Sequence, residues 1–169
     1  MNNIVLIGMP ASGKSTAGVL LAKKLGFDYI DCDLLIQKRE NAFISQVLEK
    51  HGVDGFIRIE EDVNASVIAD KSIISTGGSV IYGARAMDHL RKLGKIVYLK
   101  VGLEELEKRL YGKDLFLRGV VMQGKVHNLS ELYAERVPLY EKYADIIVDC
   151  DNLSLDDTVD AIIEAIKLK

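Results

Sequence analysis

The strongest constraint on the fold comes from one loop and its two flanks near the start of the chain. Residues 8–16 read Gly-Met-Pro-Ala-Ser-Gly-Lys-Ser-Thr and fit the pattern G-x-x-x-x-G-K-[ST] at every fixed position. The apolar run 3–7 before them is typical of a buried parallel strand, and apolar spacing in 15–25 predicts a helix. This order predicts a phosphate-binding loop (P-loop); a chance match in an ordinary glycine-rich turn is the alternative.

The residue types of the P-loop suit phosphate chemistry. Gly8 and Gly13 allow positive φ and a close backbone approach to a ligand, so that successive N–H groups can face phosphate oxygens. Lys14 would reach the β- and γ-phosphates, and the Ser15 hydroxyl would bind Mg²⁺. The loop residues expected to contact the nucleotide are Gly8, Ala11, Ser12, Gly13, Lys14, Ser15 and Thr16. We therefore expect the chain to bind ATP or another nucleoside triphosphate together with Mg²⁺.

Composition limits the remaining classes of protein. A chain of 169 residues suits one α/β domain, 1–169, and no apolar run reaches the roughly 18 residues of a membrane span. The net charge of −3, without a basic stripe, argues against nucleic acid as a partner. Cys32 and Cys150 lack zinc spacing and are expected to be free thiols. We expect a cytoplasmic monomer without a signal peptide that contacts neither nucleic acid nor a membrane.

Apolar runs and helical patterns alternate along the chain. This alternation predicts a mostly parallel sheet with helices on both faces. Pro138 falls inside the last but one helix, where we expect a kink or a restart of the helix. The predicted strands are 3–7, 27–30, 71–76, 95–101 and 145–150, and the predicted helices are 15–25, 41–51, 55–70, 82–93, 103–111, 128–143 and a closing helix after 154.

Two carboxylates follow the second predicted strand. In an extended segment Asp31 and Asp33 would face the same way, at the sheet edge where α/β folds place ligands. One acid would then act on Mg²⁺ through water, and the other on a substrate hydroxyl. The alternative, compatible with this one, makes Asp33 the N-cap of a helix that begins at Leu34.

Two further stretches suggest a ligand site but have ordinary explanations. Arg58 and Glu61 are three residues apart on a predicted helix, a spacing typical of a surface ion pair. Gly77 and Gly78 follow the third strand, which suits either a close backbone approach to a ligand or a plain turn.

Residues 113–127 form no regular pattern and are predicted to be a mobile lid. Long irregular segments inside a compact domain usually bind ligands or close over them. Arg118 in this segment could neutralise charge on a transferred phosphoryl group, or it could be a solvated surface arginine.

Taken together, these motifs resemble those of the shikimate kinase family, in the nucleoside-monophosphate-kinase-like group of P-loop folds. The resemblance covers essentially the whole chain. It rests on the P-loop, on Asp31-Cys32-Asp33 in the place of a D-x-D, on residues 56–61 in the region of F-R-x-x-E, on Gly77-Gly78-Ser79 in the place of a glycine triplet, on a lid that carries Arg118, and on residues 135–140, which fit R-x-P-L-Y at every fixed position.

The resemblance implies a role for each of these positions. Asp33 would orient or deprotonate the acceptor hydroxyl, and Arg136 and Arg58 would bind the acceptor carboxylate. Gly77 and Gly78 would line the acceptor site, where Gly78 donates its backbone N–H. Residues 33–62, approximately, would form the substrate-binding helical region.

The resemblance also extends to the nucleotide side and to the fold. Asp31 would act on Mg²⁺ through water, Arg109 would pack against adenine, and Lys14 and Arg118 would assist transfer. The implied fold is a three-layer P-loop kinase with strand order 2-3-1-4-5. The implied activity is transfer of the ATP γ-phosphate to the 3-hydroxyl of shikimate, a step in chorismate and aromatic amino-acid biosynthesis.

Four positions depart from the family pattern. Ser79 replaces the third glycine of the triplet, Gln37 replaces a glutamate, and Ile57 stands where the family has an arginine, with Arg58 one residue later. In the lid, Arg118 is followed by glycine rather than proline. These departures keep open a related kinase for another hydroxy acid or polyol, such as a gluconate-type kinase, and a nucleotide-binding relative without catalysis.

Overall fold

The computed structural model describes residues 3–112, 120–122 and 126–167. The strands are β1 (Asn3–Ile7), β2 (Asp28–Asp31), β3 (Ser72–Ser75), β4 (Gly94–Lys100) and β5 (Ile146–Asp149). The helices are α1 (Lys14–Leu25), α2 (Cys32–Glu40), α3 (Ile44–Ala65), the 3-10 helix η1 (Val80–Tyr82), α4 (Ala84–Leu93), α5 (Leu103–Leu110), α6 (Leu129–Tyr143) and α7 (Leu155–Lys167).

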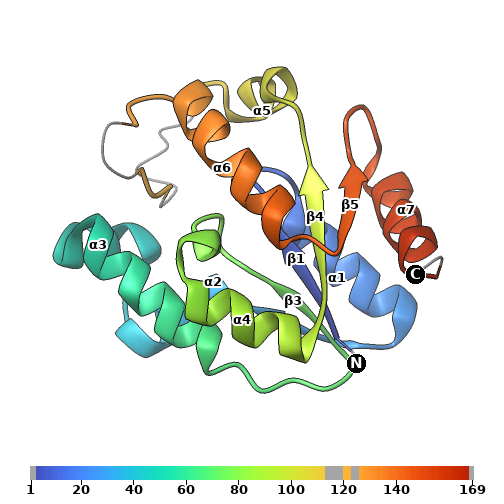
Figure 1. Cartoon of the computed structure of the whole chain (residues 1–169), viewed down its shortest axis with the longest axis horizontal. Coiled ribbons are helices and arrows are strands. Elements are labelled where there is room, and N and C mark those ends of the chain that lie inside the picture. Colours follow the sequence, from blue (N-terminus) through green and yellow to red (C-terminus); the bar gives the residue numbers. More distant parts are fainter. Residues whose placement is uncertain (1–2, 113–119, 123–125, 168–169) are drawn as a thin grey trace.

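The strands form one parallel sheet in the order β2-β3-β1-β4-β5, which confirms the predicted order. Helices α1 and α7 pack together on one face, and α4 and α6 cover the other (Figure 1). All five residues of the central strand β1 are buried, as expected for a strand covered on both faces. Because every strand runs the same way, the carboxyl ends of β1, β3 and β4 meet at one edge of the sheet.

A second apolar cluster holds α2 and α3 beside that edge. It is separate from the large core around the sheet, and its buried members are Ile36, Val47, Leu48, Phe56, Val63 and Val121. Each large apolar side chain that is fully buried contributes about 1.5–3 kcal/mol. This cluster therefore fixes the position of the two helices relative to the site.

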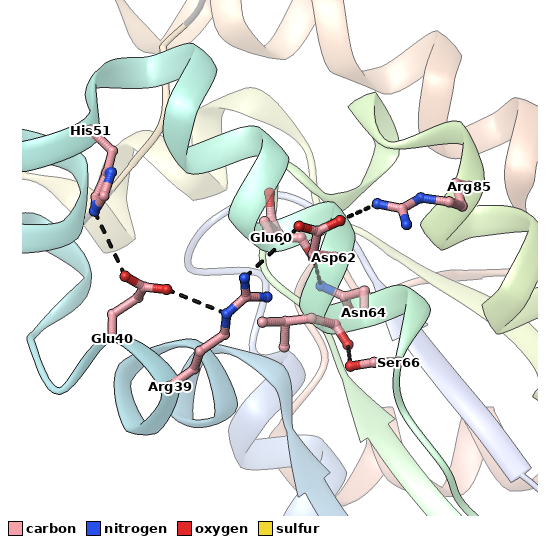
Figure 2. A network of polar contacts seen from close by, with 9 residues as sticks. Arg39, Glu40, His51, Glu60, Asp62, Asn64, Ser66 and Arg85 are labelled. Atoms are coloured by element: carbon pink, nitrogen blue, oxygen red, sulfur yellow. Dashed lines mark hydrogen bonds and ion pairs between the residues drawn. The ribbon is translucent and has the colours of Figure 1, made fainter.

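An ion-pair network crosses the outer surface of the same helices (Figure 2). Arg39 of α2 pairs with Asp62 of α3, which also pairs with Arg85 of α4. Glu40 contacts both Arg39 and His51. These side chains are partly exposed, and exposed pairs contribute about 0–1 kcal/mol, so we attribute the packing of α2 and α3 mainly to the apolar cluster.

The structure corrects the bounds of two predicted helices. The helix predicted for 55–70 is the second half of α3 and ends at Ala65, after a break at Gly52 (φ 66°, ψ 179°) that separates it from the first half as predicted. The helix predicted from residue 82 begins at Ala84, after η1.

Of the two outcomes predicted at Pro138, a kink or a restart of the helix, the restart is wrong, because α6 runs as one helix from Leu129 to Tyr143. A proline inside a helix removes one backbone hydrogen bond and costs about 3 kcal/mol. Leu132, Arg136 and Tyr140 are all buried on this helix, and their packing on both sides of the proline offsets that cost.

Asn3 joins three segments at the edge of the sheet opposite the P-loop. Its side-chain amide donates hydrogen bonds to the carbonyls of Ala69 (3.0 Å) and Leu93 (2.9 Å). Its side-chain oxygen accepts from the backbone N–H of Ser72 at 2.9 Å. One buried side chain thus satisfies three backbone groups that would otherwise lack partners.

We predict that Asn3→Ala lowers the free energy of unfolding by about 3 kcal/mol, because it leaves three buried backbone groups unpaired. Urea denaturation with an unchanged m-value would measure the loss. Asn3→Asp keeps the acceptor for Ser72 but places a carboxylate against two carbonyl groups, so its loss at pH 7 should be larger. A loss below about 1 kcal/mol in both variants would contradict this role.

Candidate active site

The P-loop is pressed against the carboxyl end of β4. A Cβ atom on Gly8 would lie 2.8 Å from the carbonyl oxygen of Leu99 and 2.9 Å from Ser12 Oγ, and φ of Gly8 is 151°. Gly13, the N-cap of α1, also has a positive φ of 94°. The two fixed glycines of the motif therefore have the roles that the sequence suggested: Gly8 allows the close approach to β4, and both glycines have a positive φ.

Lys14 lies buried across the inside of this loop. Its Nζ donates hydrogen bonds to the carbonyls of Gly8 and Met9, both at 2.8 Å, and to Ser12 Oγ at 3.4 Å. Burial lowers the pKa of Lys14 to about 8, and the negative charge of Asp33 acts in the opposite direction. Phosphate oxygens near the ammonium group would favour its charged form.

A cavity of about 440 Å³ opens beside the P-loop at the carboxyl edge of the sheet. It brings together residues from five parts of the chain: the P-loop with the start of α1, the start of α2, the loop after β3, residues 120–121, and α6. The residues that line it are Pro10, Ala11, Gly13, Lys14, Ser15, Thr16, Asp33, Thr76, Gly78, Ser79, Val120, Val121 and Arg136.

The prediction that Asp31 and Asp33 face the same way in an extended segment is wrong, because Asp33 lies in α2. Asp31 ends β2 and is the N-cap of α2, where its Oδ1 accepts from the N–H groups of Asp33 (3.0 Å) and Leu34 (3.3 Å). The N-cap is thus Asp31, not Asp33, because the helix begins two residues earlier than predicted. Tyr29 donates to the other oxygen of Asp31 at 3.1 Å.

Asp33 lies in the first turn of α2 and lines the cavity. Burial, followed by the charge of Asp31, raises the pKa of Asp33 to about 6, while Lys14 opposes this shift. A carboxylate so placed is a stronger base than a solvated one, and a positioned carboxylate can orient or deprotonate a hydroxyl.

The loop after β3 has no room for side chains at its two glycines. A Cβ on Gly77 would collide with Glu60 Oε1 and lie 2.8 Å from Asp33 Oδ1. A Cβ on Gly78 would lie 2.9 Å from Nη1 of Arg136. The close approach of side chains from α2, α3 and α6 therefore accounts for both glycines, and their approach to a ligand stays a prediction.

Arg136 is the largest fully buried side chain, with 1% of its surface exposed, and it lines the cavity. Its Nη2 donates to the carbonyl of Val121 at 2.6 Å, and its Nε donates to the Tyr82 hydroxyl at 3.2 Å. The guanidinium carbon also lies 5.3 Å from the centre of the Tyr82 ring, within cation–π range. These contacts hold a planar, permanently charged group ready for a carboxylate.

Tyr140 lies one turn after Arg136 on α6. Its hydroxyl donates to the carbonyl of Gly78 at 2.5 Å and so ties the glycine loop to the helix that carries the arginine. The Tyr140 ring stacks on that of Tyr98 in β4, with centres 5.0 Å apart. The Tyr98 hydroxyl is buried and has no hydrogen-bond partner within the described part of the chain.

Glu60 belongs to the site, although the sequence analysis gave it no role. Its side chain is 1% exposed, and its Oε2 accepts a hydrogen bond from, or donates one to, Ser79 Oγ at 2.5 Å. Burial raises the pKa of Glu60 to about 8. A signal was present in the sequence, because Phe56, Glu60 and Val63 recur at spacings of four and three on the buried face of α3.

Arg109 lies beside the P-loop, outside the main cavity. It donates to the carbonyl of Ala11 at 3.2 Å and to Glu105 at 2.8 Å. It lines a second cavity of about 210 Å³ together with Gly13, Cys150 and five other residues. A half-buried, partly apolar cavity next to the phosphate loop has a suitable position for a nucleotide base.

Among the described residues, the predicted site residues that do not line the main cavity are Gly8, Ser12, Asp31, Arg58, Gly77 and Arg109. Arg58 is exposed on α3, while Ile57 before it packs against the second apolar cluster. Glu61, predicted to pair with Arg58, instead accepts a hydrogen bond from the backbone N–H of Arg85. Arg118 and most of the predicted lid lie outside the described residues; Val120 and Val121 are described and are buried.

The donor set at the P-loop suits Mg²⁺ only together with a nucleotide. Among the described residues, no group of three or more His, Cys, Asp or Glu side chains could hold a metal ion. Mg²⁺ needs few protein ligands when phosphates and water supply the others, and the exposed Ser15 hydroxyl lines the cavity. The residues present therefore fit Mg²⁺ bound with ATP.

Comparison with known proteins agrees with this geometry. A family model described as shikimate kinase matches residues 10–167. A shikimate kinase of Clostridium botulinum (strain Langeland) is 39% identical over 168 residues, which cover 99% of this chain and 97% of that protein. A shikimate kinase of Thermodesulfovibrio yellowstonii is 36% identical and covers 97% of this chain and 94% of its own.

Solved structures give the same result. The shikimate kinase of Acinetobacter baumannii in complex with shikimate superposes with a TM-score of 0.85 at 28% identity and covers 99% of this chain and 94% of its own. The shikimate kinase of Aquifex aeolicus has a TM-score of 0.80 at 30% identity, and the match covers 98% of this chain and 96% of that protein.

We predict opposite effects for the two stacked tyrosines. Tyr140→Phe removes the bond to Gly78 and should lower the free energy of unfolding by about 1 kcal/mol. Tyr98→Phe removes a buried hydroxyl without a described partner and should leave stability unchanged or raise it slightly. Urea denaturation of both variants measures the difference, and equal losses would contradict the assigned role of Tyr140.

Proposed function

Because this chain belongs to the shikimate kinase family, we propose that it transfers the γ-phosphate of ATP to the 3-hydroxyl of shikimate, giving shikimate 3-phosphate. The observation that carries the proposal is the composition of one cavity wall. Lys14 of the P-loop, Asp33 of α2 and Arg136 of α6 line the same cavity, so a phosphate donor, a hydroxyl and a carboxylate can each meet a suitable group.

The nucleotide side of the site would use the P-loop backbone, Lys14 and Arg109. The P-loop N–H groups and the N-terminus of α1 would cradle the phosphates. Lys14 would exchange its bonds to Gly8 and Met9 for bonds to the β- and γ-phosphates. Arg109 would lie against the adenine in the second cavity.

The acceptor side would use charge and hydrogen bonds from three elements. Arg136 would bind the carboxylate of shikimate through its planar fork. Gly77 and Gly78 would line the acceptor site, with the Gly78 N–H as a donor. Asp33 would orient the 3-hydroxyl and accept its proton as the phosphoryl group moves, so that positioning and charge neutralisation carry most of the catalysis.

Mg²⁺, when bound with ATP, would neutralise phosphate charge. Ser15 would be its protein ligand, and Asp31 would act on it through water, which is compatible with a carboxylate that already caps α2. Arg118 keeps its proposed role over the phosphates. Arg58 would have to reach the acceptor from an exposed position, and it has the weakest support.

A second candidate is a kinase for another small hydroxy acid or polyol, such as a gluconate-type substrate. The observation that favours it is the apolar packing of Ile57 at a position where the resemblance implies a cation. A non-catalytic nucleotide-binding relative is the third candidate, and the joint placement of Lys14 and Asp33 in one cavity argues against it.

We further propose a cytoplasmic monomer that takes small molecules as partners and makes no contact with nucleic acid or membranes. Cys32 and Cys150 are both free and buried, as suits a reducing compartment. No helix in the described residues has the length and apolar character needed to cross a membrane.

The direct test is the rate of ADP formation with saturating Mg-ATP, with and without shikimate. We expect a shikimate-dependent kcat of about 1–100 s⁻¹, typical of kinases. The same assay with gluconate and other hydroxy acids serves as the comparison. A higher kcat/KM with another acceptor would transfer the assignment to that substrate, and ATP binding without turnover of any acceptor would favour the non-catalytic relative.

The clamp role of Arg136 predicts a selective effect on the acceptor. Arg136→Lys should raise the KM for shikimate about 10- to 100-fold, because charged hydrogen bonds contribute about 1.5–3 kcal/mol and lysine lacks the planar fork. The KM for ATP should change little. Arg85→Ala, which removes an exposed arginine outside the cavity, is the matched control. An unchanged KM for shikimate in Arg136→Lys would refute the clamp.

A further inference from the structure

A buried pair of side chains, Glu60 and Ser79, forms part of the acceptor side of the cavity. Ser79 is 4% exposed and lines the cavity, whereas Glu60 lies behind it at 1% exposure. Their oxygens are 2.5 Å apart, at the short end of the range for hydrogen bonds between oxygen atoms. Asp62, two residues after Glu60 on α3, lies instead in the ion-pair network of the outer surface (Figure 2).

The surroundings of Glu60 disfavour its ionised form. Its second oxygen, Oε1, is buried and has no hydrogen-bond partner among the residues that the structure describes. Leaving a charged oxygen in that position is costly, and protonation removes most of the cost. The pKa of Glu60, raised to about 8 by burial, agrees with this geometry. The titratable groups that face Glu60 are Lys14, Cys32, Asp33, Arg136 and Tyr140.

The protonation state of Glu60 decides what Ser79 can offer to a ligand. A neutral Glu60 donates its Oε2 proton to Ser79 Oγ, which leaves the Ser79 proton free to turn toward the cavity. An ionised Glu60 can only accept, so it engages the Ser79 proton and leaves the serine with lone pairs alone. Ser79 is thus a donor in the first state and an acceptor in the second.

The position of Ser79 fits a carboxylate. It follows Gly78, whose Cα lies against Nη1 of Arg136. Among the described residues that line the cavity, Lys14 and Arg136 are the cations, and Lys14 belongs to the phosphate loop. A carboxylate bound at Arg136 would therefore gain from a further donor on the neighbouring loop, and a negative charge on Glu60 would repel it.

We propose that Ser79 contacts the acceptor carboxylate beside Arg136, and that Glu60 is a positioning residue whose proton keeps the Ser79 hydroxyl available as a donor. This inference rests on the proposed function, since it requires an acceptor with a carboxylate. It gives the serine that departs from the glycine triplet a role in acceptor binding, and it predicts that binding of the acceptor weakens as Glu60 loses its proton.

The test is the KM for shikimate between pH 7 and pH 9 at saturating Mg-ATP, for the wild type, Glu60→Gln and Ser79→Ala. For a group that titrates near pH 8 and binds only when protonated, the KM of the wild type should rise about tenfold over this range. Glu60→Gln, which keeps an amide donor for Ser79, should have a nearly constant KM. Ser79→Ala should raise the KM about tenfold at pH 7 while kcat changes little.

Two controls distinguish the effect of Glu60 and Ser79 from that of other buried or titratable side chains. Ser72→Ala removes another buried serine hydroxyl, bonded to the carbonyl of Asp70 at the far end of β3, and should leave the KM unchanged. Lys14 also has a pKa of about 8, so a KM that still rises with pH in Glu60→Gln would assign the effect to Lys14 and overturn the inference.

Two further outcomes have distinct meanings. Normal turnover with a pH-independent KM in the wild type, or an unchanged KM in Ser79→Ala, would overturn the role of the pair and leave the proposed function intact. Absence of shikimate-dependent turnover in the wild type, together with absence of shikimate binding by calorimetry in the presence of ADP, would overturn both.

Discussion

The burial of charge at one edge of the sheet is the constraint on which the rest of the site depends. Lys14, Asp33, Glu60 and Arg136 lie close together there, each largely removed from water. Isolated buried charges cost several kcal/mol each, so every one of them needs a partner or must lose its charge. The P-loop carbonyls, the Ser79 hydroxyl and the Tyr82 hydroxyl are those partners. When Glu60 is neutral, the charged groups at the cavity are the cations Lys14 and Arg136 and the anion Asp33. The cavity therefore favours anionic ligands.

The sequence predicted the frame of the molecule better than the details of the site. Alternating apolar runs predicted the parallel sheet, and the resemblance to the shikimate kinase family implied its strand order. Of the kink or restart expected at Pro138, the restart does not occur, because long-range burial of Arg136 and Tyr140 outweighs a local preference. Asp31 took the capping role expected of Asp33, since a boundary shift of two residues exchanges the roles of neighbouring side chains.

Glu60 shows why local patterns do not find every functional side chain. On a helix next to several other acids it resembles a solvated residue. Two signals distinguish it: its spacing to Phe56 and Val63, and its place as the glutamate of F-R-x-x-E when that motif is aligned on Phe56. Its contacts come from Ser79 and Gly77, which lie almost twenty residues further along the chain. Such a contact requires the path of β3 and the loop after it, and these are properties of the fold rather than of the segment around residue 60.

The bond between Tyr140 and Gly78 has a consequence for how specificity can change. Arg136 and Tyr140 lie one turn apart on α6, so that helix and the glycine loop form one unit, which would bear most of the proposed acceptor contacts. The phosphate cradle belongs to β1 and α1 instead. Substitutions in the first unit can therefore alter which hydroxy acid is accepted while the second keeps its ligand, and a lineage could exchange acceptors without rebuilding its nucleotide site.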